Sequence, residues 1–132
     1  MTIDEFAKTC FSDIDKGTIQ ENAFNMNENY KGKNIELTGM PFQVMRGQYG
    51  NILFVILSET KADNGDLCAI GVKLKDSKQA GKLHINIGNK DFVTSGYIRV
   101  RGKFEEYRIT EQNNKPGRFI HTVFIQDGEV LE

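Results

Sequence analysis

The chain has 132 residues, the size of one domain with a single hydrophobic core. Its apolar and charged fractions, 39% and 27%, are ordinary for a folded protein, and no segment reaches membrane-spanning length. A net charge of −1 argues against a strong, nonspecific binder of polyanions. Residues 1–30 carry two bases and six acids, whereas the remainder carries 15 bases and 12 acids. An acidic segment therefore precedes a mildly basic one, although scatter among solvated charges is the alternative interpretation.

Two capping boxes predict two short helices before residue 30. In the first, Thr2 stands at the N-cap and Glu5 at the third helical position. Apolar residues then recur at helical spacing on one face, at Ile3, Phe6, Ala7, Cys10 and Phe11. The second box, residues 18–21, opens a helix that is expected to run to about Met26. We expect both helices to lie in an N-terminal extension, residues 1–29.

From residue 33 the apolar period changes to two, which predicts β-strands. The first strand is expected over residues 33–46, with a bend at Gly39 and Pro41. Polar turns are expected over residues 58–66 and 113–117. The other expected elements are strands 51–57, 67–75, 96–109 and 118–126 and a short helix over 76–82. Five strands with a helix after the third predict a mainly β, five-stranded OB-fold barrel over residues 30–130.

Short motifs in this pattern resemble the tRNA_anti-like group of bacterial OB-fold proteins. They are Asn22-Ala23, Tyr30-Lys31-Gly32-Lys33, Leu37-Thr38-Gly39, Gly96 and Val100-Arg101-Gly102-Lys103. The resemblance covers roughly residues 20–126, and the chain departs from the group at Met40-Pro41-Phe42 and in a long loop around 59–66. It implies an OB fold and a role in nucleic-acid binding.

Members of that group are often exported or lipid-anchored. The N-terminus here lacks the basic-then-apolar pattern of a signal peptide. The sequence therefore favours a cytoplasmic location, and export or lipid anchoring stays open if a native signal has been removed.

A site for single-stranded nucleic acid on an OB barrel needs a basic groove and exposed aromatic rings, walled by the loops after the first and fourth strands. Candidate residues occupy those loops and the outer face of the third strand, together with Phe54 on the second strand, whose apolar run leaves its direction open. They are Arg46, Tyr49, Phe54, Lys73, Lys75, Tyr107, Arg108, Lys115 and Arg118. Ordinary polar loop residues are the alternative interpretation. The sequence therefore predicts a module that binds single-stranded DNA or RNA.

A different function is open on the same scaffold. The near-neutral charge and the lack of a clear aromatic platform favour a module that binds a protein or an oligosaccharide without affinity for nucleic acid. An apolar patch around Met40, Phe42 and Val44 is the candidate surface for that alternative.

A row of alternating bases occurs on the fourth predicted strand, at Arg99, Arg101 and Lys103. Such a row resembles a phosphate track, but Glu36 on the first strand is expected to lie opposite it. Opposite charges on paired strands are an ordinary stabilising device. We therefore expect these bases to be paired with acids rather than to bind a ligand.

No pattern in the sequence indicates an enzyme, a metal site or a cofactor. His84 and His121 lack carboxylate or cysteine partners at ligand spacing, so structural roles are expected for both. Cys10 and Cys68 lie in apolar runs outside any ligand spacing, which predicts buried core thiols.

Overall fold

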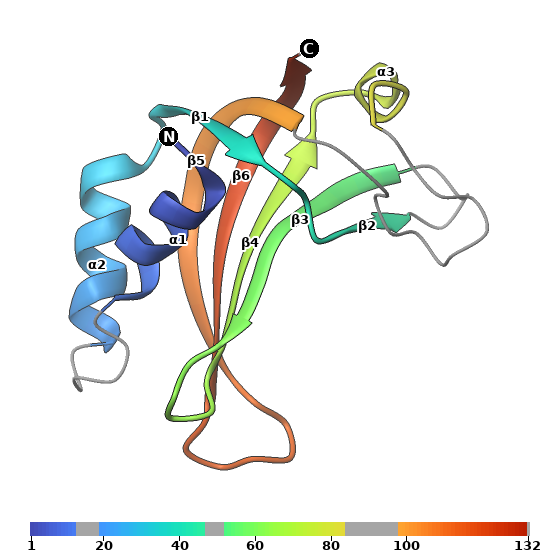
Figure 1. The fold of residues 1–132 in the computed structure, drawn as a ribbon. Helices are drawn as coiled ribbons and strands as arrows, with labels where there is room; N and C mark the ends of the chain where they lie inside the picture. The colour runs from blue at the N-terminus through green and yellow to red at the C-terminus, as the bar shows by residue number, and fades with distance from the viewer. Residues whose placement is uncertain (13–18, 47–51, 84–97, 132) are drawn as a thin grey trace.

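The chain folds into a curved mixed sheet with its N-terminal helices packed on one side (Figure 1). The computed structural model describes residues 1–12, 19–46, 52–83 and 98–131. Its helices are α1 (Ile3–Phe11), α2 (Ile19–Tyr30) and α3 (Ser77–Ala80). Its strands are β1 (Asn34–Gly39), β2 (Gln43–Arg46), β3 (Ile52–Lys61), β4 (Leu67–Leu74), β5 (Ile98–Glu111) and β6 (Phe119–Leu131). The predicted class, mainly β with short N-terminal helices, is confirmed.

The six strands lie in the order β1-β5-β6-β4-β3-β2. Every neighbouring pair is antiparallel except β4 and β6, which run parallel. The two outermost strands, β1 and β2, are consecutive in the chain and are separated only by residues 40–42. Over the described residues, the sheet curves strongly but is not closed into the predicted five-stranded barrel (Figure 1).

The single first strand predicted over residues 33–46 is instead two strands. Gly39 has a φ of 155°, which L side chains rarely adopt, and the Ile3 side chain packs where a Cβ would lie. After this break, Phe42 donates its N–H to the carbonyl of Ile56 on β3, 2.8 Å away, and β2 begins. The predicted bend is therefore sharp enough to move the chain from one edge of the sheet to the other.

Strand β3 is longer than the predicted strand over residues 51–57. Its ladder to β4 shifts between Ile56 and Ser58 and then continues to Lys61, which pairs with Leu67. The sequence at 58–61 is polar because these side chains lie at or near the surface of an edge strand. The polar loop predicted over residues 58–66 is thus reduced to a turn.

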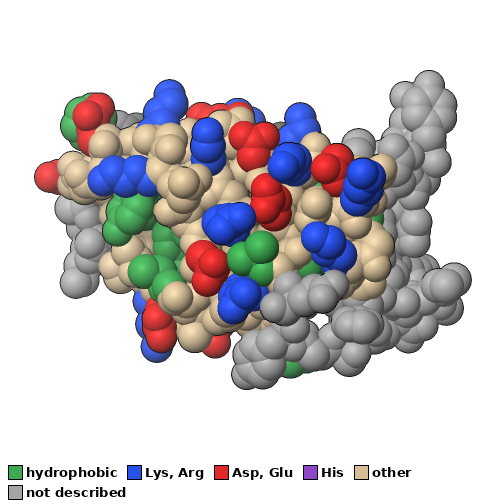
Figure 2. Space-filling view, turned by 90° about the horizontal axis from the view of Figure 1, so that it is seen from above, with side chains coloured by type: hydrophobic (Ala, Val, Ile, Leu, Met, Phe, Trp, Pro, Cys, Tyr) green, Lys and Arg blue, Asp and Glu red, His purple; other side chains and the backbone are tan. Residues whose placement is uncertain are grey.

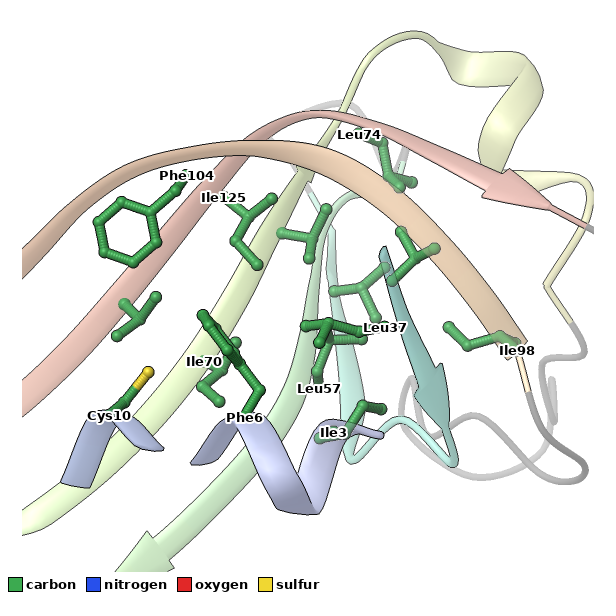
Figure 3. Close-up of a cluster of buried hydrophobic side chains, with 14 of the residues drawn as sticks. Ile3, Phe6, Cys10, Leu37, Leu57, Ile70, Leu74, Ile98, Phe104 and Ile125 are labelled. Carbon is green, nitrogen blue, oxygen red and sulfur yellow. The ribbon is translucent and has the colours of Figure 1, made fainter. Parts of the chain in front are cut away.

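Helix α1 begins as predicted. The Thr2 hydroxyl accepts a hydrogen bond from the Glu5 N–H at 3.0 Å, and the Glu5 carboxylate accepts one from the Thr2 N–H at 3.4 Å. The arch of the sheet covers the apolar face of α1, so Phe6 and Cys10 point toward Phe104 and Ile70 (Figure 3). The helix is therefore part of the same hydrophobic core as the strands.

Helix α2 is fixed to the long strand β5 by its Asn27 side chain. The Asn27 amide donates to the Tyr107 carbonyl at 3.2 Å and accepts from the Tyr107 N–H at 2.7 Å. One turn further on, the ring of Tyr30 contacts the rings of Phe6 and Phe104. In the described part of the chain, no helix is long and apolar enough to cross a membrane.

Candidate nucleic-acid interface

Two phenylalanines form an aromatic pair on the outer face of the sheet. Phe54 on β3 and Phe124 on β6 alternate with core residues, and both are only partly buried. Their ring centroids are 6.2 Å apart with an interplanar angle of 63°. Between them lies Gly71 of β4, where an added Cβ would stand 2.2 Å from an atom of the Phe54 ring. The missing side chain therefore lets the Phe54 ring lie across β4 toward Phe124.

Basic side chains flank this pair on both sides. Lys73 is exposed and stands directly opposite Phe54 in the β3–β4 ladder. On the other side, the guanidinium carbon of Arg108 lies 4.8 Å from the centroid of the Phe124 ring, a cation–π contact. Arg108 also forms an ion pair with Glu106 on the same strand. We call Phe54, Lys73, Arg108 and Phe124 the aromatic–basic patch.

The prediction that Tyr107 presents its ring at a loop wall is wrong. Tyr107 and Arg108 lie within β5, not in a loop, and alternation sends their side chains to opposite faces. Tyr107 is only 3% exposed and packs in the core against Phe11. Burial raises the pKa of its phenol well above the ordinary range.

Tyr107 belongs to a buried chain of polar side chains with His121 and Asp66. The Tyr107 oxygen is 2.9 Å from His121 Nδ1, and His121 Nε2 is 2.8 Å from Asp66 Oδ2. A carboxylate only accepts, so the histidine donates from Nε2, and in the neutral imidazole Nδ1 then accepts the tyrosine O–H. The second carboxylate oxygen accepts the Phe119 N–H at 3.0 Å. All three side chains are enclosed, so the structural role predicted for His121 fits this position.

The pKa of Asp66 reflects two opposing influences. Burial raises it, while the hydrogen bonds from His121 and Phe119 and the nearby imidazole lower it, and the net result lies below the ordinary value. The carboxylate therefore stabilises the folded state in its charged form. Cys10 and Cys68 are both buried thiols, as predicted, and burial raises the pKa of the Cys10 thiol to about 12.

The remaining predicted residues are not among the four of the aromatic–basic patch, and some fall outside the described residues. Lys115 and Arg118 are exposed in the connection between β5 and β6, where the Arg118 side chain lies beside Gly65 of the β3–β4 turn. Arg46 is the last residue of β2, and Tyr49 falls outside the described residues, as does His84.

Lys75 takes part in a separate charged cluster. Its ammonium is 3.1 Å from Glu129, which also accepts from Arg101 at 3.1 Å, and both cations hold the pKa of Glu129 below its usual range. Arg99 approaches Glu36 at 4.0 Å, so the predicted pairing of bases with acids is confirmed for Arg99 and Arg101. On the face shown in Figure 2, basic and acidic side chains are interspersed rather than gathered by sign.

The sequence prediction missed Phe124. Its signal was present, because His121, Val123 and Ile125 alternate as the buried residues of β6 and leave Phe124 on the outer face. The neighbours of Phe124 were not predictable from the sequence, because Arg108 and Gly71 are brought next to it only by the β5–β6 and β4–β6 ladders.

Comparisons of the chain with protein-family models, with curated proteins and with solved structures found no match.

Proposed function

We propose that the chain is an OB-type binding module, rather than an enzyme, that takes a short single strand of DNA or RNA across the outer face of its sheet. The observation that carries this proposal is the aromatic–basic patch. It offers two rings on which bases stack and, beside them, two cations that attract phosphates. The resemblance to the tRNA_anti-like group supports the same assignment.

The OB-type interpretation is supported by the order of the strands. Residues 33–46, predicted as one bent first strand, supply both edge strands of the sheet. β1 pairs with β5, the predicted fourth strand, and β2 pairs with β3, the predicted second strand. The predicted third and fifth strands, β4 and β6, are parallel neighbours. A sheet of this connectivity curls toward a small barrel whose outer face is available to a ligand.

The composition of the patch indicates weak, sequence-tolerant binding. Stacking contributes about 1–3 kcal/mol per base, and each ring has a face that accepts any base. Arg108 is already neutralised in part by Glu106, and the net charge of the chain is −1. With two phosphate contacts, the logarithm of the binding constant should fall against the logarithm of salt concentration with a slope of about −1.4.

Fluorescence anisotropy with a labelled oligothymidylate at low salt tests the stacking. Phe124→Ala and Phe54→Ala should each weaken binding by about 1–3 kcal/mol, because each removes one ring. Phe24→Ala is the matched control, since Phe24 is 62% exposed on α2 and lies outside the patch. Thermal unfolding of each variant separates lost binding from lost folding. Wild-type affinity in both patch variants, or no binding by the wild-type chain, contradicts the proposal.

The salt dependence tests the two cations. Lys73→Gln and Arg108→Gln should each make the slope less steep by about 0.7, the amount expected for one phosphate contact. Lys8→Gln on α1 removes the same charge from an exposed position outside the patch and should leave the slope unchanged. Equal slopes in all four proteins would assign the binding to another surface.

A second candidate function, recognition of a protein or an oligosaccharide, is favoured by the exposure of Met40 and Phe42, which are 59% and 43% exposed. Val44, predicted to share this surface, is buried in the core, so that part of the prediction is wrong. If titration with single strands shifts no amide signals, this candidate becomes the better one, and Met40→Glu should then weaken binding of the partner.

A further inference from the structure

Within the described residues, the second half of β3 is a sheet edge without a pairing strand. Strand β2 stops covering it where Phe42 bonds to Ile56. Beyond that point residues 58–61 pair only with β4 among the described residues of the chain. Edge strands of this kind are templates for pairing with another strand.

The direction of the backbone groups along this edge follows from the turn that ends it. Ala62 donates its N–H to the Asp66 carbonyl at 2.8 Å, so this pair is hydrogen bonded. Hydrogen-bonded and non-hydrogen-bonded pairs alternate along an antiparallel ladder. Thr60 therefore bonds to β4, whereas Glu59 and Lys61 aim their N–H and C=O groups away from β4, toward the open side.

The side chains on this edge are complementary to themselves. If a second copy lies antiparallel with Thr60 opposite Thr60, each Glu59 stands opposite a Lys61 of the other copy. The same two residues carry the outward backbone groups, so they form hydrogen-bonded pairs, and Thr60 forms the non-hydrogen-bonded pair on the two-fold axis. We propose that the Ser58–Lys61 edge of β3 joins a second copy of this chain in that register, as a symmetric dimer.

Neighbouring registers lack this match. A shift that centres the pairing on Glu59 places the two carboxylates opposite each other, and a shift that centres it on Lys61 does the same with the two ammonium groups. Like charges directly opposite destabilise a strand pair, while opposite charges stabilise it. The charges therefore favour one register of the paired edge. Charged residues that only prevent edge strands from pairing need not be arranged in this way.

There is room beside the edge for an incoming strand. A groove of about 390 Å³ runs between α1 and the edge, lined on the strand by Ser58 and Thr60. From α1 and its C-cap it is lined by Asp4, Ala7, Lys8, Phe11 and Ser12. A paired strand would lie about 4.8 Å from β3, and its own Ser58 and Thr60 side chains would face this groove.

Sedimentation velocity over a concentration series tests the dimer with the full chain. Glu59→Lys or Lys61→Glu alone places like charges opposite each other twice and should weaken self-association about tenfold. The double reversal, Glu59→Lys with Lys61→Glu, restores both pairs with the charges exchanged and should recover wild-type association. Glu28→Lys, an exposed change on α2, is the control for net charge and should have no effect.

Crosslinking tests the register independently of charge. Thr60→Cys should form an intermolecular disulfide under mild oxidation by copper phenanthroline, because non-hydrogen-bonded pairs bring their Cα atoms to about 4.5 Å. Ser77→Cys, also exposed, should crosslink poorly, and the native Cys10 and Cys68 are buried. A wild-type chain that stays monomeric at every concentration, or a double reversal as weak as either single one, overturns the proposal.

Discussion

At the scale of single residues, three buried polar side chains depend on one another for their hydrogen bonds. Tyr107, His121 and Asp66 satisfy all their hydrogen-bonding atoms within the core, and among the described residues no buried side-chain polar atom lacks a partner. Removing one member leaves the next one unpaired where water cannot reach it, which is costlier than losing the bond itself.

Tyr107→Phe removes only the O–H that His121 accepts at Nδ1. The free energy of unfolding should fall by about 1–3 kcal/mol, the penalty for an unsatisfied buried acceptor. Urea denaturation followed by circular dichroism measures it. Unchanged stability would mean that the imidazole finds another donor.

Asp66→Asn should flatten the acid side of the stability profile. Because the pKa of Asp66 is lower in the folded protein than the ordinary 3.8, its ionised form favours folding. That contribution is complete above the ordinary pKa and is lost as the pH falls through the folded pKa. Unfolding free energies measured by urea from pH 7 to pH 2 should therefore decline less steeply in the variant, and identical slopes would contradict the assignment.

Sequence reasoning could assign His121 a structural role but could not find its partners. Asp66 and Tyr107 are 55 and 14 residues away in the chain and meet His121 only after β4, β5 and β6 have paired. The same limit explains the error at Tyr107. Strict alternation from the buried Phe104 would expose Tyr107 and bury Arg108. The register shift between Phe104 and Glu106 reverses that phase, so Tyr107 is buried and Arg108 lies on the outer face.

At the scale of elements, Gly71 of β4 determines where the ring of Phe54 lies. Gly71→Ala places a Cβ 2.2 Å from that ring, so the ring must swing away from Phe124. Oligonucleotide affinity should then fall toward that of Phe54→Ala, while stability changes little because the displaced group is a side chain on the outer face. Anisotropy and urea denaturation on one preparation check both, and full affinity would show that the ring position is unimportant.

Most elements were predictable because their signals are local. The capping box fixed the start of α1, and the period of two at Ile98, Val100 and Phe104 fixed the inward face of β5. The ends of strands were less predictable: β3 runs to Lys61 and β6 to Leu131, since polar residues are accepted where a neighbouring strand supplies hydrogen bonds. Whether a sheet edge remains unpaired depends on segments that are distant in the sequence, so local patterns do not predict it.

For the whole molecule, α1 acts as one wall of the core rather than as an appendage. Ile3, Phe6 and Cys10 are buried in the same cluster as the strand residues. A chain lacking residues 1–12 should therefore lose cooperative thermal unfolding and the dispersion of its amide NMR spectrum, because it exposes the inner surface of the sheet. A dispersed spectrum from the shortened chain would show that the sheet folds alone.

The central place of β6 has a consequence for how the protein is made. β6 follows the other five described strands in the sequence, yet it lies between β5 and β4, and its parallel partner β4 lies about 50 residues earlier. Synthesis proceeds from the N-terminus, so β4 and β5 leave the ribosome before β6. Their edges that face β6 therefore remain unpaired until β6 emerges. The six-stranded sheet can be completed only after residue 131 has left the exit tunnel, and until then the surface that covers α1 is incomplete.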